Sequence, residues 1–209
     1  MAKFLRTSGR ARLRRSLEAV ARPLARIGLT ANIVTMLGTA VIVAAAVVLI
    51  PQGRILTALI VITLAAFTDL IDGAMARVSG GGSRFGALLD STCDRIADGA
   101  LFAALAFYLF AEGRTVAGAF ALWTLVASEV ISYVKARAES LGVRGSVGLM
   151  ERPERLILIG VVAIVELLGV PYAWEAGFAL LAVLSSVTVV QRLLYSKRFL
   201  NSEDRVDAR

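Results

Sequence analysis

Long runs of apolar residues constrain the fold of this chain more than any other feature. Each run is about long enough to cross the roughly 30 Å hydrocarbon core of a bilayer. The runs cover residues 31–50, 55–78, 84–111, 115–139, 153–171 and 173–195. The 209 residues are 57% apolar, whereas soluble domains average about 45–50%. The pattern predicts an all-α integral membrane protein with six transmembrane helices, preceded by an amphipathic surface helix at the N-terminus.

Basic residues are divided unevenly between the two ends of these runs. Every Lys and Arg except Arg54 and Arg114 falls before the first run, near the second turn, near the fourth turn or near the C-terminus. Lys and Arg concentrate on the cytoplasmic side of membrane proteins. This distribution therefore predicts a multi-pass protein of the plasma membrane with both termini in the cytoplasm. An odd number of spans would put one basic group on the wrong side.

The polar ends of the chain flank the predicted membrane domain. The expected domains are a cytoplasmic juxtamembrane segment at 1–29, a six-helix membrane domain at 30–195 and a cytoplasmic tail at 196–209. The first segment has apolar residues at helical spacing: Leu13, Leu17, Val20 and Leu24. This spacing is typical of an amphipathic helix on a membrane surface; a solvated basic arm is the alternative. The net charge of +7 is not read as nucleic-acid binding, because the basic regions lack interleaved aromatic residues.

Four aspartates lie on either side of a glycine-rich break. Asp69 and Asp72 are three residues apart, and Asp90 and Asp94 are four apart, so each pair shares a helix face. The sequence SGGGS between the pairs is expected to separate two helices. We therefore predict a helical hairpin whose four carboxylates converge near the cytoplasmic end. Structural ion pairs are the alternative, although a charge within the membrane costs about 2.5–3.5 kcal/mol and rarely persists without a role.

Converging carboxylates repel one another unless cations lie among them. The chain contains no His, and oxygen ligands alone favour a hard ion such as Mg²⁺ or Mn²⁺. Two divalent ions would formally balance four carboxylates. We predict that Asp69, Asp72, Asp90 and Asp94, the aspartate motif, bind metal and hold a pyrophosphate during its cleavage. Asp98, one turn further on, is expected either to support the metal ligands without binding metal or to have a structural role.

The spacing around this motif resembles the signature of the CDP-alcohol phosphotransferases, membrane enzymes that make phospholipids from CDP-activated donors. The matching positions are Asp69, Asp72, Gly73, Ala76, Arg77, Gly86, Asp90 and Asp94. The resemblance implies that the first three aspartates bind metal, and that the fourth binds metal and accepts the proton of the acceptor hydroxyl. The distribution of basic residues places this active site at the cytoplasmic side. Because such enzymes are commonly homodimers, a homodimer is expected.

Further residues are expected to bind the donor, CDP-diacylglycerol. Arg77 can hold a phosphate at two points, and Gly73 allows a ligand to approach closely; helix anchoring and helix contact are the alternatives. Ser83, in the glycine-rich turn, could donate to a phosphate or shape the turn. The segment LTANIVT resembles the part of the family that helps hold the cytidine end, although Ala31 replaces a proline common in relatives. Its candidate residues are Asn32, Ile33, Val34 and Thr35.

A second basic group comes from three different predicted helices. We call its members the acceptor cations: Lys135, Arg137, Arg155 and Arg192. They are candidates for binding the phosphate of an anionic acceptor, and membrane anchoring is the alternative. The stretches 132–142 and 148–156 resemble the phosphatidylinositol phosphate synthases of actinobacteria, a branch of the family. That resemblance implies that inositol 1-phosphate is the acceptor, and that phosphatidylinositol phosphate and CMP are the products.

Two other functions are alternatives to phosphatidylinositol phosphate synthesis. Phosphatidylglycerophosphate synthesis from glycerol 3-phosphate needs the same donor and an anionic acceptor, so the basic residues do not separate it from the first hypothesis. A divalent-cation transporter would spread carboxylates along the depth of the membrane, whereas here they cluster near one end. Metal-dependent release of CMP from CDP-diacylglycerol would distinguish a transferase from a transporter.

Overall fold

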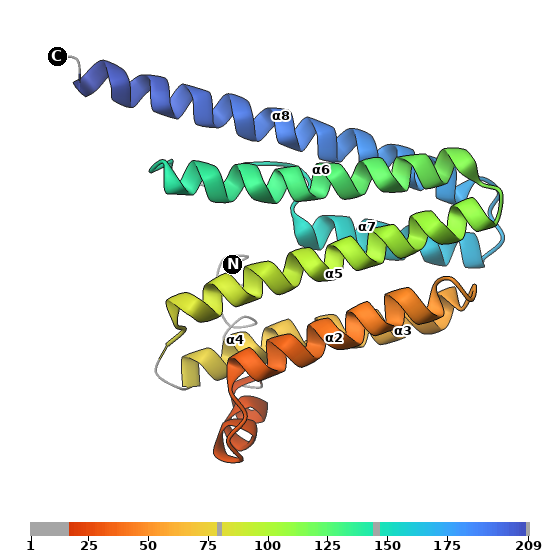
Figure 1. The fold of residues 1–209 in the computed structure, drawn as a ribbon, viewed down its shortest axis with the longest axis horizontal. Helices are drawn as coiled ribbons and strands as arrows, with labels where there is room; N and C mark the ends of the chain where they lie inside the picture. The colour runs from red at the N-terminus through yellow and green to blue at the C-terminus, as the bar shows by residue number, and fades with distance from the viewer. Residues whose placement is uncertain (1–16, 79–80, 144–146, 208–209) are drawn as a thin grey trace, which may run out of the picture. The chain divides into compact units, whose positions relative to one another are not determined.

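The computed structural model describes residues 17–78, 81–143 and 147–207. All regular structure within these ranges is helical, and the ranges contain no strand (Figure 1). The predicted all-α fold class is confirmed to that extent. Residues 1–16, with Leu13 of the predicted amphipathic helix, lie outside the described part of the chain.

The chain divides into two compact units. The first unit comprises Met1–Leu49 and Thr57–Ala97, and the second comprises Ile50–Leu56 and Asp98–Arg209. The first unit contains a helical stretch at 17–26 and the following helices: α2 (Ala31–Leu49), most of α3 (Ile55–Ala66), α4 (Thr68–Val78) and the first half of α5 (Arg84–Ala111). Within this unit α2 packs against α4.

The predicted helix over residues 55–78 is broken at Phe67. Around the break the backbone forms tighter bonds, from the Phe67 N–H to the Leu64 carbonyl (3.3 Å) and from the Leu70 N–H to the Phe67 carbonyl (3.1 Å). The Thr68 hydroxyl also donates to the Ala65 carbonyl, at 2.6 Å. A side-chain bond of this kind competes with regular helix geometry. The break means that the first two aspartates of the motif belong to a short separate helix, α4.

The helical stretch at 17–26 uses part of its apolar face within the protein. Ala21 is fully buried together with Ala74 and Met75 of α4, and Leu17 and Leu24 pack against this cluster. Val20, in contrast, is 50% exposed. The described part of the predicted amphipathic helix thus packs on α4 and keeps other apolar side chains exposed.

The second unit contains the remainder of α5 with three more helices: α6 (Thr115–Ser140), α7 (Arg152–Leu167) and α8 (Ala173–Asp207). Helix α8 packs against both α6 and α7. The core of the second unit includes Trp174, which stacks on Phe178 at a centroid distance of 5.8 Å. It also includes Phe102 of α5, whose ring contacts Phe178 edge to face. Helix α8 continues without interruption through residues 196–207, which the sequence assigned to a tail.

Four helices among the described residues are long and apolar enough to cross a membrane: Ala31–Leu49, Ile55–Val78, Thr115–Ser140 and Ala173–Ser202. These agree with four of the six predicted spans. The other two correspond to α5 and α7. Helix α5 carries Asp94, Arg95 and Asp98 next to its apolar half, and α7 has 16 residues. Their assignment as spans remains a prediction.

Candidate functional site

The aspartate motif lies on two helices of the first unit. Asp69 and Asp72 occupy consecutive turns of α4, and Asp90 and Asp94 occupy consecutive turns of α5. The glycine-rich turn between them includes Gly81, whose φ of +115° is rarely adopted by residues with a side chain. The predicted helix–turn–helix order of the motif is therefore present in the structure.

Ser83 caps the helix that carries the second aspartate pair. Its Oγ accepts a hydrogen bond from the Gly86 N–H at 2.8 Å, which is the usual role of serine before a helix. The cap fixes where α5 begins and hence the turn on which Asp90 and Asp94 lie. Because Oγ accepts in this bond, the hydroxyl hydrogen can still be donated elsewhere.

Asp72 is the most enclosed carboxylate of the motif. The residue is 7% exposed, and its Oδ2 lies 2.6 Å from the hydroxyl of Thr35 on α2. The same hydroxyl lies 3.0 Å from the Ala31 carbonyl. A hydroxyl has a single hydrogen, and the shorter contact to the charged group is the stronger of the two. The sequence predicted that Thr35 binds CDP-diacylglycerol. In the structure, Thr35 positions a carboxylate of the aspartate motif.

Asp69 and Asp90 are near enough to Asp72 for their charges to act on it. Three carboxylates from two helices therefore repel one another at this place. No group of three or more His, Cys, Asp or Glu side chains in the described ranges is arranged to hold a metal ion. Three of the four aspartates that were predicted to converge are thus near one another, and the described residues do not form a closed ligand shell. Oxygen donors that repel one another fit a hard divalent cation, which would relieve the repulsion.

Asp94 has surroundings different from those of Asp72. Its side chain is 23% exposed, and its Oδ2 lies 3.6 Å from the guanidinium of the neighbouring Arg95. Asp94 is thus partly open to solvent, and its role as the proton acceptor remains a prediction.

The predicted donor residues gather around two glycines of the first unit. A Cβ atom on Gly86 would lie 3.1 Å from both Asn32 Oδ1 and Ser83 Oγ, so these two polar side chains converge over the start of α5. A Cβ on Gly73 would lie 3.6 Å from Arg77 Nη1. The guanidinium of Arg77 therefore lies over the bare backbone next to Asp72.

The remaining two donor candidates offer apolar surface. Val34 packs against the buried cluster around Met75, and Ile33 is 40% exposed. Val34 also lines an open apolar groove of about 370 Å³, together with Leu37, Gly38, Val41, Val61, Leu64, Ala65 and Thr68. Any role of these residues is thus one of shape and apolar contact.

The acceptor cations all belong to the second unit, but they differ in exposure. Lys135 and Arg137 are exposed near the end of α6. Arg155 is 1% exposed and Arg192 is 6% exposed. The sequence did not predict this division, because basic residues at the ends of apolar runs look alike whether they are buried or exposed.

Protein groups hold both buried arginines. Arg192 donates to the carbonyls of Val147 (2.9 Å) and Ile131 (2.9 Å), and its Nη2 lies 3.1 Å from Glu151 Oε1. Its three nitrogens therefore link α8 to α6 and to the segment before α7.

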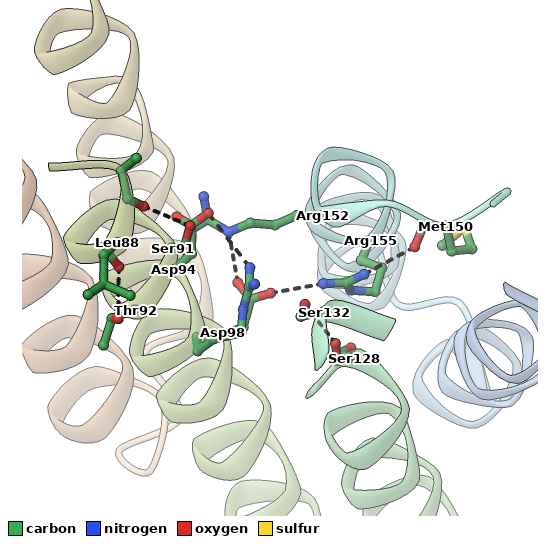
Figure 2. A network of polar contacts seen from close by, with 12 residues as sticks. Leu88, Ser91, Thr92, Asp94, Asp98, Ser128, Ser132, Met150, Arg152 and Arg155 are labelled. Atoms are coloured by element: carbon green, nitrogen blue, oxygen red, sulfur yellow. Dashed lines mark hydrogen bonds and ion pairs between the residues drawn. The ribbon is translucent and has the colours of Figure 1, made fainter. Parts of the chain in front are cut away.

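Arg155 and Arg152 connect α7 to Asp98 of α5. Arg155 Nη2 and Arg152 Nε each lie 3.1 Å from one of the two Asp98 oxygens, and Arg155 Nη1 donates to the Met150 carbonyl at 3.1 Å. Figure 2 shows the carboxylate of Asp98 facing both arginines. Asp98 is 1% exposed, so the paired arginines compensate a buried charge. The structural role predicted for Asp98 is confirmed, whereas Arg152 was not singled out from the sequence.

A second charged cluster lies at the opposite ends of the helices of the second unit. Arg114, in the turn before α6, donates to Glu175 Oε1 at 2.9 Å and also pairs with Glu166. The hydrogen bonds that Arg114 donates to Glu175, aided by the one that it donates to Glu166, raise the pKa of Arg114 above its usual value. In the sequence Arg114 was only an exception to the charge asymmetry. The signal that could have identified the cluster is its position beside two acids at the ends of apolar runs.

Comparison with known proteins agrees with the family that the aspartate motif resembles. The profile of the CDP-alcohol phosphatidyltransferase family matches residues 28–191. The phosphatidylinositol phosphate synthase of Mycobacterium tuberculosis is 47% identical over 188 residues, which cover 88% of this chain and 87% of the relative. The phosphatidylinositol phosphate synthase of Streptomyces avermitilis is 41% identical over 203 residues, which cover 93% of this chain and 83% of the relative.

Solved structures of the Mycobacterium tuberculosis enzyme have the same fold. The crystal structure with CDP-DAG bound superposes with a TM-score of 0.83 at 46% identity, covering 87% of this chain and 94% of that chain. The crystal structure in complex with manganese and citrate gives a TM-score of 0.79 at 45% identity, covering 86% of this chain and 88% of that chain.

Proposed function

This chain belongs to the CDP-alcohol phosphatidyltransferase family, and from that premise we propose that it makes phosphatidylinositol phosphate. The reaction transfers the phosphatidyl group of CDP-diacylglycerol to inositol 1-phosphate and releases CMP. One observation carries the proposal: the 47% identity to a phosphatidylinositol phosphate synthase extends over 88% of this chain and 87% of the relative.

The aspartate motif is the proposed metal site, with two Mg²⁺ ions as the expected occupants and Mn²⁺ as an alternative. The proposal is supported by the oxygen-only character of the motif, by the mutual repulsion around Asp72 and by the manganese complex of a relative. When bound, divalent ions would neutralise the pyrophosphate and stabilise the leaving phosphate.

The chain's own residues supply the remaining chemistry. Asp94 takes the proton of the acceptor hydroxyl, whose oxygen attacks the phosphorus that bears diacylglycerol. The bond from this phosphorus to the bridging oxygen breaks, and the negative charge leaves with CMP. Arg77 pairs with the phosphate of the departing CMP. Thr35 holds Asp72 in place, since its hydroxyl lies 2.6 Å from the carboxylate.

The donor and the acceptor are assigned to different sets of residues. We assign the nucleotide end of CDP-diacylglycerol to Gly73 and Arg77 of α4, to Ser83 before α5, and to four residues of α2: Asn32, Ile33, Val34 and Thr35. We assign the acceptor phosphate to Lys135 and Arg137 by direct contact, because both are exposed. The other two acceptor cations, Arg155 and Arg192, would shape this site, because their Nη atoms already bond to protein groups.

The wider context of the reaction follows from the same premise. We propose a plasma-membrane enzyme with six spans, both termini in the cytoplasm and the active site on the cytoplasmic side, acting as a homodimer. The charge asymmetry of the helix ends and the four candidate spans support this arrangement.

A competition assay tests the proposed acceptor against the main alternative. The purified protein in lipid would receive labelled CDP-diacylglycerol, Mg²⁺ and equal concentrations of inositol 1-phosphate and glycerol 3-phosphate. We expect phosphatidylinositol phosphate as the main product, with CMP released in equal amount. Phosphatidylglycerophosphate as the main product would replace the proposal by the alternative, and absence of CMP release would favour a cation transporter.

Metal removal is expected to abolish the reaction. Treatment with a chelator should stop CMP release, and added Mg²⁺ or Mn²⁺ should restore it, because the pyrophosphate charge is otherwise unbalanced beside several carboxylates. CMP release at an undiminished rate in the chelator would rule out a metal-dependent mechanism.

A further inference from the structure

An open, basic groove lies beside the aspartate motif in the first unit. It has a volume of about 630 Å³ and is lined by Glu18, Arg22, Ala25, Arg26, Arg77 and Val78. Arg22 and Arg26 are four residues apart in the helical stretch at 17–26, so they project from one face toward the same space. Arg77 enters from the last turn of α4. We call this feature the arginine groove.

The positive charge of the arginine groove is not used inside the protein. Within the ranges that the structure describes, neither Arg22 nor Arg26 forms an ion pair with a carboxylate, and Glu18 is the single acid among the lining residues. Three guanidinium groups around an open space attract phosphate, which they can bind through paired N–H groups. The groove therefore has the chemistry of a phosphate site.

The position of the groove indicates where its phosphate comes from. Val78, which lines the groove, is the last residue of the candidate span Ile55–Val78, and the candidate span Ala31–Leu49 begins five residues after Arg26. The groove thus lies where candidate spans reach the membrane surface. Val20 and Ile27 beside it are 50% and 74% exposed, which suits contact with lipid rather than water.

We propose that the arginine groove binds the headgroup phosphate of an anionic phospholipid from the surrounding leaflet. Arg22 and Arg26 hold the phosphate, with Arg77 at the inner edge, while the exposed side chains of Val20 and Ile27 contact the acyl region. Arg77 borders both this groove and the proposed donor site, whereas Arg22 and Arg26 belong to the groove alone. The lipid site would be the same whichever acceptor the enzyme uses.

A lipid-retention experiment tests the arginine groove directly. The full-length protein in detergent is mixed with equal amounts of phosphatidylglycerol and phosphatidylcholine of the same acyl composition, and bound lipids are counted by native mass spectrometry. Each arginine near an anionic lipid surface is worth about a fivefold change in binding. We therefore expect the double variant Arg22→Gln/Arg26→Gln to lower the ratio of bound phosphatidylglycerol to phosphatidylcholine by roughly tenfold or more.

Two further variants separate this site from general effects of charge. Lys197→Gln/Arg198→Gln removes the same charge from exposed positions of α8 and should leave the ratio unchanged. Arg22→Lys/Arg26→Lys keeps the charge and should restore most of the retention. Equal ratios for the wild type and the Gln variant, or an equal loss in the α8 control, would overturn the proposal.

Two additional arms identify the source of the phosphate. Millimolar inorganic phosphate should not displace phosphatidylglycerol, and its displacement would assign the groove to a soluble phosphate instead. The Gln variant should keep a KM for CDP-diacylglycerol within about twofold of the wild type if its lipid site is separate. A raised donor KM with normal phosphatidylglycerol retention would assign Arg22 and Arg26 to the donor and overturn the proposal.

Discussion

At the scale of single residues, the hydroxyl of Thr35 connects the aspartate motif to a neighbouring helix. It is the described hydrogen-bond donor that reaches Asp72 from another helix. A buried carboxylate that loses such a donor is left without compensation for its desolvation. Thr35 therefore matters to the site even though its side chain need not touch the substrate.

Replacing Thr35 by Val should weaken the proposed metal site. Loss of a hydrogen bond that orients a ligand typically lowers metal affinity or activity by about 10- to 100-fold. Titration of CMP release with Mg²⁺ measures the effect as a rise in the half-saturating concentration. Thr92→Val is the matched control, because the Thr92 hydroxyl donates within its own helix, to the Leu88 carbonyl at 2.9 Å. Equal metal requirements for both variants would contradict this role.

Replacing Asp94 by Asn should lower turnover at saturating Mg²⁺ by about 10²- to 10⁴-fold, the usual contribution of a general base. Ser91→Ala, on the same helix, removes a hydroxyl that bonds only within its helix and should leave turnover nearly normal. Near-normal turnover of the Asn variant would exclude Asp94 as the base.

Single residues also mark where sequence reasoning stops. The spacing of the four aspartates predicted a helix pair and a shared site, because helical periodicity brings such residues onto one face. The burial of two acceptor cations was harder to predict, because burial depends on partners that are distant in sequence. Arg192 donates hydrogen bonds to the carbonyls of Ile131 and Val147. No local sequence pattern around position 192 predicts those contacts.

At the scale of helices, the contact between α2 and α4 depends on a missing side chain. A Cβ atom on Gly38 would overlap the side chain of Thr68. Thr68 cannot move away freely, because its hydroxyl is bonded to the Ala65 carbonyl at 2.6 Å. Close approach at Gly38 thus supports the same pair of helices that brings Thr35 to Asp72.

The substitution Gly38→Ala should therefore destabilise the protein by about 1–3 kcal/mol, the usual cost of forcing extra atoms into a packed contact. Gly99→Ala is the control, because a Cβ on Gly99 would meet nothing within 4 Å, and alanine favours a helix by up to about 1 kcal/mol. Thermal unfolding in detergent should show a lower midpoint for the first variant only. A higher midpoint for Gly38→Ala would contradict the packing argument.

Arg114 joins the ends of α7 and α8. Changing it to Gln would leave Glu166 and Glu175 without their cation. We expect a loss of about 1–3 kcal/mol, less than the 3–5 of a fully buried pair, because these side chains are 24–28% exposed. The midpoint of thermal unfolding would measure this loss of stability. Arg54→Gln is the control, because Arg54 is exposed in the turn directly before α3. Equal midpoints for both variants would remove this role.

The helices themselves were largely predictable, and their interruptions were not. Apolar run length located α5 at residues 84–111 and α6 to within one residue of its end, Ser140. The break at Phe67 escaped prediction because the residues on both sides are apolar and favour one continuous helix. A side-chain hydrogen bond of Thr68 lies at the break, and hydrophobic periodicity does not reveal a bond of this kind.

At the scale of the whole molecule, the proposed substrates divide between the two units. All proposed donor and metal residues belong to the first unit, and all acceptor cations belong to the second. Helix α5 contributes to both, with Asp90 and Asp94 in one unit and Asp98 in the other. No pattern in the sequence indicates this division, because the boundary falls inside a continuous helix.

Mutations in the two units should therefore affect different Michaelis constants. Arg77→Gln should raise the KM for CDP-diacylglycerol, and Lys135→Gln should raise the KM for inositol 1-phosphate, each by roughly tenfold or more for a lost charged hydrogen bond. Each variant should leave the other KM within about twofold. Initial rates over a grid of both substrates would measure the four constants, and equal effects of both variants on both constants would contradict the division.

The unbroken course of α8 has a geometric consequence for the end of the chain. Its 35 residues amount to a rod about 52 Å long at 1.5 Å per residue. The oily interior of a bilayer accounts for roughly 30 Å of that length. If α8 crosses the bilayer, about two-fifths of its length lies among the headgroups or in water. The last turns of α8 then form a rigid extension to which a spectroscopic label can be attached away from the proposed active site.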